Sequence, residues 1–97
     1  MNLRSSKILE KFSANSSETE QYLMCSELTD CQRSFKWNEW EFGMDLFDRP
    51  YLIQQLSEEN LLRTIVVIVE RERLNPGFFS NLRKSGILYD IINRLRN

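Results

Sequence analysis

A run of six β-branched residues, 64–69, lies inside a segment whose start signals are those of a helix. Ser57 can accept a hydrogen bond from a first-turn amide, and Glu58 and Glu59 suit the positive end of a helix dipole. Local preference alone favours a buried strand for the run. A strand would have to pair with another subunit, because the chain offers no second β-branched or alternating stretch. We therefore predict a buried central helix over about residues 57–73, apolar nearly all round its middle.

Capping signals place another helix in the first third of the chain. Ser17 and Glu20 have the spacing of a capping box, in which each side chain hydrogen-bonds a free amide of the other's turn. Leu28, with Leu23 or Met24 about one turn earlier, marks the apolar edge of this helix. We therefore expect the helix to begin directly after Ser17 and to bury that edge.

The last third contains a break followed by two more helices. Asn75 suits the N-cap and Pro76 the first turn of a new helix, where the missing amide of proline costs nothing. Gly86 suits the end of that helix. Of the 97 residues, 41% are hydrophobic and only three are Gly and two Pro. We predict an all-α compact single domain over residues 1–97, with five to six short helices and a loosely attached N-terminal helix within residues 1–16.

The sequence carries no sign of secretion or membrane insertion. Arg4 and Lys7 near the amino end are not followed by the unbroken apolar segment of a signal peptide. The longest apolar run, residues 65–69, is far shorter than the ~20 residues that cross a bilayer. Cys25 and Cys31 are too few for a disulfide scaffold, so we expect reduced, partly buried thiols. We predict a cytoplasmic protein with no membrane contact.

The sequence contains no histidine, which disfavours most enzyme classes. Triads built on His, the usual proton shuttle near neutral pH and the commonest metal ligand are all removed. Neither a Gly-x-Ser-x-Gly sequence nor a phosphate-binding loop is present. We therefore expect a non-enzymatic protein that uses no metal and no cofactor.

Charge is distributed unevenly along the chain, although the net charge is only −1. Residues 18–48 contain eight acids and two bases, whereas residues 71–97 contain six bases and two acids. Such asymmetry concerns the partners of a protein rather than its fold. The candidate partner-binding residues come from both stretches: Trp37, Trp40, Glu41, Asp45 and Asp48 from the acidic one, and Arg71, Arg73, Arg83, Lys84, Arg94 and Arg96 from the basic one.

The acidic candidates lie on a predicted aromatic helix in the middle of the chain. Trp37 and Trp40 suit the centre of an interface, but in a small domain they also suit the core. Glu41, Asp45 and Asp48, spaced four and three residues apart, share one helix face. They lack the glycine-containing loop of a calcium site. The face is either a solvated surface or a docking stripe for a basic partner.

The basic candidates admit three interpretations. They could neutralise the phosphates of a nucleic acid, yet the isoelectric point near 5.5 is far from the values above about 9 expected of such domains. They could instead form solvated ion pairs or contact a protein partner. For Arg73 the alternatives are an anion bound at the start of the next helix, or capping of the central helix together with an acidic pair.

Short motifs recur through the second half of the chain. They are Trp-x-x-Trp (Trp37 and Trp40), Arg-Leu-x-x-Gly (Arg73, Leu74 and Gly77), Ser-Gly (Ser85 and Gly86) and Arg-Leu (Arg94 and Leu95). In this combination, over about residues 35–96, the chain resembles a small bacterial domain family of unknown function. It departs from that family at Leu74, where an aromatic residue is usual, and at Glu70, where a basic residue is expected. The resemblance implies no activity.

Together these observations favour a small protein–protein interaction module. The partner is expected to be another protein, bound through the acidic aromatic helix or the basic carboxyl-terminal helices. One alternative is an inhibitor of a host defence complex encoded by a phage or mobile element, and another is a nucleic-acid binder. A homodimer is also expected, because residues 65–69 would gain from further cover.

Overall fold

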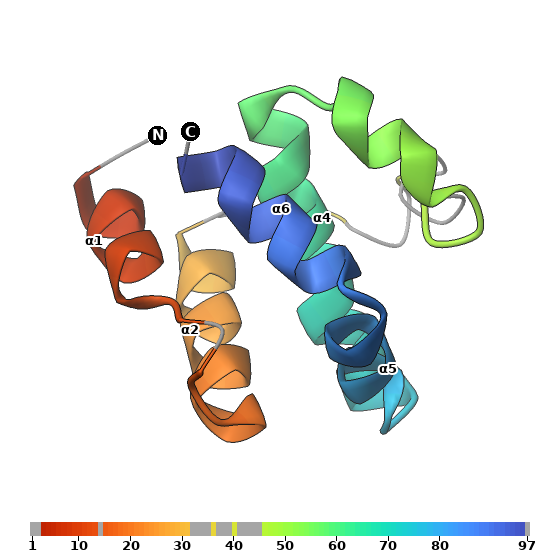
Figure 1. Ribbon diagram of the computed structural model, residues 1–97, viewed down its shortest axis with the longest axis horizontal. Helices are drawn as coiled ribbons and strands as arrows, with labels where there is room; N and C mark the ends of the chain where they lie inside the picture. The colour runs from red at the N-terminus through yellow and green to blue at the C-terminus, as the bar shows by residue number, and fades with distance from the viewer. Residues whose placement is uncertain (1–2, 14, 32–35, 37–39, 41–45, 97) are drawn as a thin grey trace.

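The structure is a computed structural model that describes residues 3–13, 15–31, 36, 40 and 46–96. These residues form six helices and no strand, which confirms the predicted all-α single domain (Figure 1). In chain order the helices are α1 (Leu3–Lys11), α2 (Glu18–Asp30), the short 3-10 helix η2 (Pro50–Gln55), α4 (Glu58–Leu74), α5 (Phe78–Ser85) and α6 (Ile87–Arg96). Within the described residues, no helix combines the length and apolar character needed to cross a membrane.

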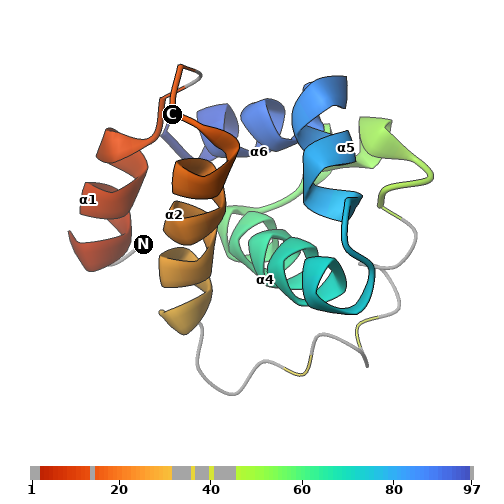
Figure 2. The same cartoon turned by 90° about the horizontal axis from the view of Figure 1, so that it is seen from below.

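Helix α4 occupies the centre of the bundle, as predicted for residues 57–73. Ser57 caps it, because its side-chain oxygen accepts a hydrogen bond from the amide of Asn60 at 3.2 Å. The hydroxyl of Thr64 donates to the carbonyl of Asn60 at 2.8 Å, so this buried polar group is satisfied within the helix. Helices α2, α5 and α6 all contact α4 (Figure 2). Burial on several sides thus outweighs the β preference of residues 64–69.

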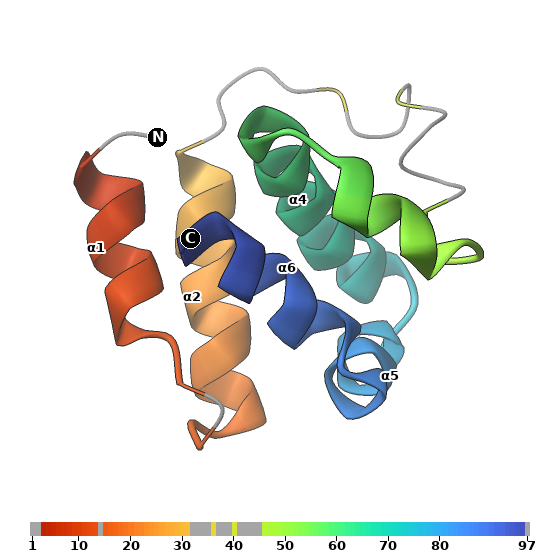
Figure 3. The same cartoon turned by 45° about the horizontal axis from the view of Figure 1, so that its top comes forward.

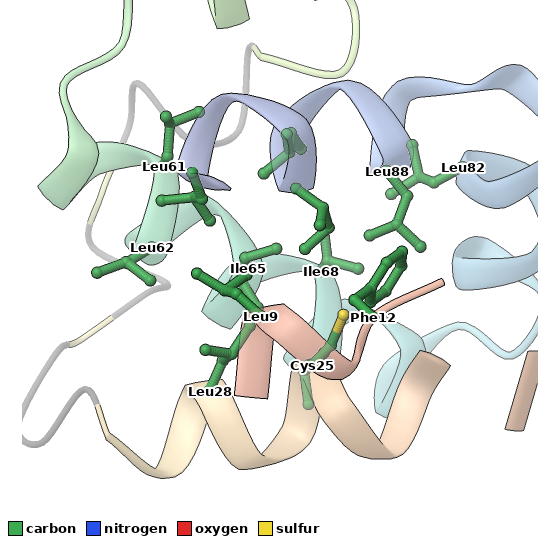
Figure 4. Close-up of a cluster of buried hydrophobic side chains, with 14 of the residues drawn as sticks. Leu9, Phe12, Cys25, Leu28, Leu61, Leu62, Ile65, Ile68, Leu82 and Leu88 are labelled. Atoms are coloured by element: carbon green, nitrogen blue, oxygen red, sulfur yellow. The ribbon is translucent and has the colours of Figure 1, made fainter. Parts of the chain in front are cut away.

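Buried apolar side chains from α1, α2, α4, α5 and α6 form one cluster around α4. Figure 4 shows part of this cluster, including Leu9 of α1, Leu28 of α2, Ile65 of α4, Leu82 of α5 and Leu88 of α6. Full burial of one such side chain contributes about 1.5–3 kcal/mol. The cluster is therefore the main source of stability, and it fixes how the helices present their outer faces.

Helix α1 packs against α2 and α6 and is part of the bundle (Figure 3). Ile8, Leu9 and Phe12 are buried at these contacts. The guanidinium of Arg96 donates a hydrogen bond to the carbonyl of Leu9 at 3.1 Å, which links the first helix to the last. The sequence suggested a loosely attached first helix. That expectation did not include the contact between Arg96 and Leu9, because these residues lie at opposite ends of the chain.

Helix α2 begins directly after Ser17, as predicted. The side chain of Ser17 accepts a hydrogen bond from the amide of Glu20 at 3.2 Å. Of the predicted apolar edge, Leu28 is buried and Met24 packs against the hydrophobic cluster, whereas Leu23, the alternative to Met24, is 56% exposed. The buried face also includes Gln21, a polar residue that is 3% exposed. A pattern of apolar residues does not identify a buried polar residue, so Gln21 was not part of the predicted edge.

The turn between α4 and α5 corrects the prediction made for Asn75. This residue ends α4, and its amide donates to the carbonyl of Arg71 at 2.8 Å. Pro76 lies in the turn, and α5 begins only after Gly77, whose φ of 103° lies in the left-handed region that favours glycine. Asn75 is not an N-cap, because the chain needs a left-handed residue to change direction before the new helix can start.

Glu72 caps α5 from the preceding helix. Its carboxylate accepts hydrogen bonds from the amides of Gly77 at 2.9 Å and Phe79 at 3.3 Å. A negative charge at this position also suits the positive end of the helix dipole. Gly86, with a φ of 86°, ends α5 as predicted, and α6 follows at once.

The two cysteines are free thiols, as expected. Cys25 is buried in the cluster, and burial raises the pKa of its thiol from 9.0 to about 12. Cys31 is half-buried at the end of α2, where its thiol donates to the carbonyl of Glu27 at 3.4 Å. A thiol with the pKa of Cys25 stays protonated near neutral pH and is a poor nucleophile.

Candidate functional site

Of the acidic aromatic candidates, Trp37, Glu41 and Asp45 lie outside the described residues. Trp40 is half-buried and packs against the hydrophobic cluster, as its interpretation as a core residue requires. Asp48 is exposed in a turn that precedes η2. The described part of the stretch therefore shows one tryptophan at the core and one carboxylate at the surface.

Arg71 is the first residue of the basic stretch, and its side chain contacts Phe47 near the end of the acidic stretch. Its guanidinium carbon is 4.6 Å from the ring centroid of Phe78 and 5.6 Å from that of Phe47. The two rings pack edge to face with centroids 5.2 Å apart. Cations over aromatic faces are attracted by the ring quadrupole. Arg71 therefore helps to attach the segment before η2 to the start of α5.

Arg73 pairs with an acid, one of the two alternatives that the sequence left open. Its Nη1 lies 3.3 Å from Oε1 of Glu70, one turn earlier on α4. An exposed pair of this kind contributes little to stability. The other alternative required a free anion at the start of α5, but the carboxylate of Glu72 already accepts the amides there. Arg73 is thus a surface ion-pair residue.

Arg94 and Arg96 bind backbone carbonyls of distant segments. Arg94 donates from Nη1 to the carbonyl of Ile53 and from Nη2 to that of Leu56 at 3.2 Å, at the end of η2. Arg96 donates to the carbonyl of Leu9 and lies with its guanidinium carbon 5.8 Å from the ring centroid of Phe12. The carbonyls of Leu9 and Ile53 each already accept one backbone amide, from Phe12 and Leu56. The two arginines add a charged donor to these carbonyls and so hold η2 and α1 against α6.

Arg83 is also held by acceptors on another part of the chain. Its Nε donates to Oε1 of Gln21 at 2.8 Å, and its Nη2 donates to the carbonyl of Ser16 at 3.2 Å. The amide of Gln21 is oriented in turn, because its Nε2 donates to the carbonyl of Ser13 at 2.8 Å. Unlike Arg94, Arg83 remains exposed. It is therefore fixed in place while still accessible to a ligand.

Arg83 and Lys84 line a hollow of about 270 Å³ at the surface. The hollow lies beside the start of α6. Helix α6 follows α5 directly and contacts α1, α4 and α5 (Figures 1 and 2). Besides the two cations, its lining consists of Phe12, Gln21, Leu88 and Tyr89. None of these described lining residues is acidic. This basic hollow is the candidate functional site.

The chemistry of the basic hollow suits a small anionic group next to an apolar one. Two positive charges attract the anion, while Phe12 and Tyr89 offer aromatic surface beside it. Its volume of about 270 Å³ is below the ~300 Å³ at which pockets for small ligands begin. One side chain of a partner therefore fits better than a nucleotide. The described residues contain no cluster of His, Cys, Asp or Glu suited to a metal ion.

Arg83 and Lys84 are among the candidates predicted from the sequence, whereas the other residues that line the basic hollow are not. Gln21 and Tyr89 come from α2 and α6, and the hydrogen bond between Gln21 and Arg83 joins residues 62 positions apart. One signal could have identified Gln21. It lies four and seven residues before Cys25 and Leu28, on the helix face that those residues share.

Comparison with known proteins gives one match. A family model described as "Family of unknown function (DUF6508)" matches residues 4–97. The match includes the amino-terminal helices, whereas the resemblance found in the sequence began at about residue 35. No curated protein and no solved structure matches the chain.

Proposed function

We propose that this chain, which belongs to the Family of unknown function (DUF6508), is a non-enzymatic protein-interaction module that receives an acidic segment of a partner in the basic hollow. One observation carries the proposal: Arg83 is fixed by neutral acceptors and lies with Lys84 in a hollow whose described lining residues include no acid. Charge complementarity of this kind steers a partner and fixes its register. The free thiols support a reducing, cytoplasmic setting.

The distribution of the arginines favours a protein partner over a nucleic acid. A nucleic acid presents a row of phosphates, and its binders carry a matching stripe of cations. Here Arg71 stacks on two phenylalanine rings, while Arg94 and Arg96 bind carbonyls of η2 and α1. These guanidinium groups are held at separate places, so among the six basic candidates of residues 71–97 it is Arg83 and Lys84 that line a common cavity in the described part of the chain.

The proposal concerns a different protein as partner, although the sequence also suggested a second copy of this chain. That suggestion rested on the need to cover residues 65–69. In the structure these five side chains are at most 4% exposed within a single chain. We therefore expect light scattering to give the monomer mass over a wide concentration range. A dimer mass would show that two copies of this chain form an interface, and that interface would then be a candidate site.

The test is a quantitative capture from lysate of the native host with three tagged baits. They are the wild-type chain, Lys84→Glu in the basic hollow, and Arg49→Glu as a matched control on an exposed residue outside it. The expected result is a stoichiometric protein that survives nuclease, binds wild type and Arg49→Glu equally, and is lost with Lys84→Glu. Loss of the bound material to nuclease would contradict the proposal and favour nucleic acid.

The identity of the captured protein then decides the biological setting. A component of a host defence complex whose activity falls on binding would establish the inhibitor alternative. Any other stable partner would name its process directly. In both cases the dependence on Lys84 shows whether the basic hollow is the binding surface.

A further inference from the structure

We propose that the basic hollow binds a phosphoryl group carried by a side chain of the partner protein. This inference rests on the proposed function and narrows it, because it names the chemical group that the hollow takes. It follows from how Arg83 is held, from the charge of the lining and from the size of the hollow.

The way in which Arg83 is held leaves its charge uncompensated. Its two acceptors, Oε1 of Gln21 and the carbonyl of Ser16, are both neutral. By contrast, Arg63 and Arg73 on α4 pair with carboxylates at 2.8 and 3.3 Å, which cancel their charge. A neutral acceptor orients a guanidinium without neutralising it. Arg83 is therefore prepared to attract an anion from outside the chain.

The geometry of Arg83 also leaves part of its guanidinium available. The internal hydrogen bonds use Nε and Nη2, whereas no described residue accepts a hydrogen bond from Nη1. Guanidinium groups bind carboxylates and phosphates through two parallel N–H donors. The outer edge, formed by Nη1 and the second N–H of Nη2, can make such a pair. Because the side chain is already fixed, little conformational entropy is lost on binding.

Gln21 makes this arrangement rigid. Its side chain is buried, with 3% of the residue exposed, and both ends of its amide are used. Nε2 donates to the carbonyl of Ser13, so Oε1 faces Arg83. A buried polar side chain that is fully hydrogen-bonded holds a unique geometry. Gln21 is thus a positioning residue for Arg83.

The charge of the lining favours a phosphoryl group over a carboxylate. Arg83 and Lys84 contribute two positive charges, and the other four lining residues that the structure describes are uncharged. A phosphorylated side chain carries about −1.5 to −2 charges near neutral pH and offers three acceptor oxygens. A carboxylate carries only one negative charge. The phosphoryl group therefore balances the basic hollow more completely.

The first test is an NMR titration of the whole chain with inorganic phosphate, against acetate at equal ionic strength. We expect saturable shifts of the Arg83 Nε–H and of the Lys84 and Tyr89 amides with phosphate, and much smaller shifts with acetate. Because Lys84→Gln removes a charge-assisted hydrogen bond to the anion, it should weaken phosphate binding about tenfold. Equal shifts with acetate, or shifts centred elsewhere, would overturn the inference.

Gln21→Glu tests the role of the neutral acceptor. The new carboxylate keeps an acceptor for Nε of Arg83 but cancels its charge, so phosphate binding should fall about tenfold. Arg49→Gln, an exposed change outside the hollow, serves as the control for charge and should leave phosphate binding unchanged. Amide spectra and melting curves identify folded variants. Undiminished binding by folded Gln21→Glu and Lys84→Gln would overturn the assignment.

A phosphatase arm of the capture experiment separates this inference from the proposed function. Loss of the partner after phosphatase treatment of the lysate supports the phosphoryl group. A partner that resists phosphatase but is lost with Lys84→Glu overturns the phosphoryl inference, while the interaction through the hollow stands. A partner that is indifferent to Lys84→Glu overturns both.

Discussion

Arg94 and Lys84 lie ten residues apart in the same basic stretch but have different roles. The guanidinium of Arg94 is half-buried and binds the carbonyls of Ile53 and Leu56 at the end of η2. Lys84 is exposed in the basic hollow, next to Arg83, which faces the same cavity. The first cation stabilises the fold, and the second remains accessible to an external anion.

The difference shows that the number of cations in a sequence does not measure a binding surface. Carbonyls near helix ends can accept a further donor, and a long guanidinium can reach them from another part of the chain. Arg94 and Arg96 both do so. A basic stretch therefore has to be divided into cations that bind the chain itself and cations that do not. The predictions below test that division.

At neutral pH the largest effect is expected for Arg94→Met, which keeps the length of the side chain but removes its donors. The carbonyls of Ile53 and Leu56 then lose a charged partner in a partly buried place. Hydrogen bonds to charged groups contribute about 1.5–3 kcal/mol, so unfolding in urea should show a loss of about 2–3 kcal/mol. Arg49→Met, at an exposed residue, is the control. A loss below about 0.5 kcal/mol would remove the contrast with Lys84.

The second effect concerns Cys25, which lies in the core one turn after Gln21 of the basic hollow. Burial raises the pKa of Cys25 from 9.0 to about 12. The unfolded chain therefore loses this proton first, so the stabilising contribution is complete below pH 9 and is lost between pH 9 and about 12. Across that window the free energy of unfolding should fall by about 1.4 kcal/mol per pH unit through this group.

The comparison protein for this measurement is Cys25→Ala. Other titrating groups are common to both proteins, so the difference in unfolding free energy between wild type and variant isolates the thiol. That difference should shrink as the pH rises above 9. A difference that does not change with pH would show that burial does not raise the pKa of the Cys25 thiol.

How much of the fold could be predicted depended on whether a signal acts locally. Ser17, Ser57 and Gly86 each act within their own helix, and all three ends were predicted correctly. Asn75 was misassigned because the cap of α5 comes from Glu72 in the preceding helix. Reciprocal caps across a turn depend on how the two helices are placed, which one sequence does not show.

The same limit applied to the candidate site. Arg83 and Lys84 were predicted from charge alone, but Gln21 and Tyr89 were not, because tertiary packing brings them to the hollow. Charge also could not separate Arg83 from Arg94. Both belong to one stretch of sequence, and only their acceptors and exposure distinguish them.

A third effect concerns an anionic side chain that also binds the backbone. Glu72→Gln keeps the shape of the side chain. It removes the negative charge and one of the two oxygens that accept hydrogen bonds from the amides of Gly77 and Phe79. Loss of a cap typically costs about 1 kcal/mol. Glu70→Gln, on the same helix, breaks only the exposed pair with Arg73 and should cost less than about 0.5 kcal/mol. Equal losses in urea unfolding would show that the cap of α5 is not structural.

The smallest effect on stability is expected for Lys84→Gln, and that small effect is what the comparison with Arg94 requires. Lys84 is exposed, and no described residue makes a hydrogen bond or ion pair with its ammonium group. Its replacement should change the free energy of unfolding by less than about 0.5 kcal/mol. Arg94→Met should show the reverse pattern, with a large loss of stability and unchanged phosphate binding by the folded protein. If Lys84→Gln destabilised the chain as much as Arg94→Met, Lys84 would be a residue that stabilises the fold and not one that is available to a partner.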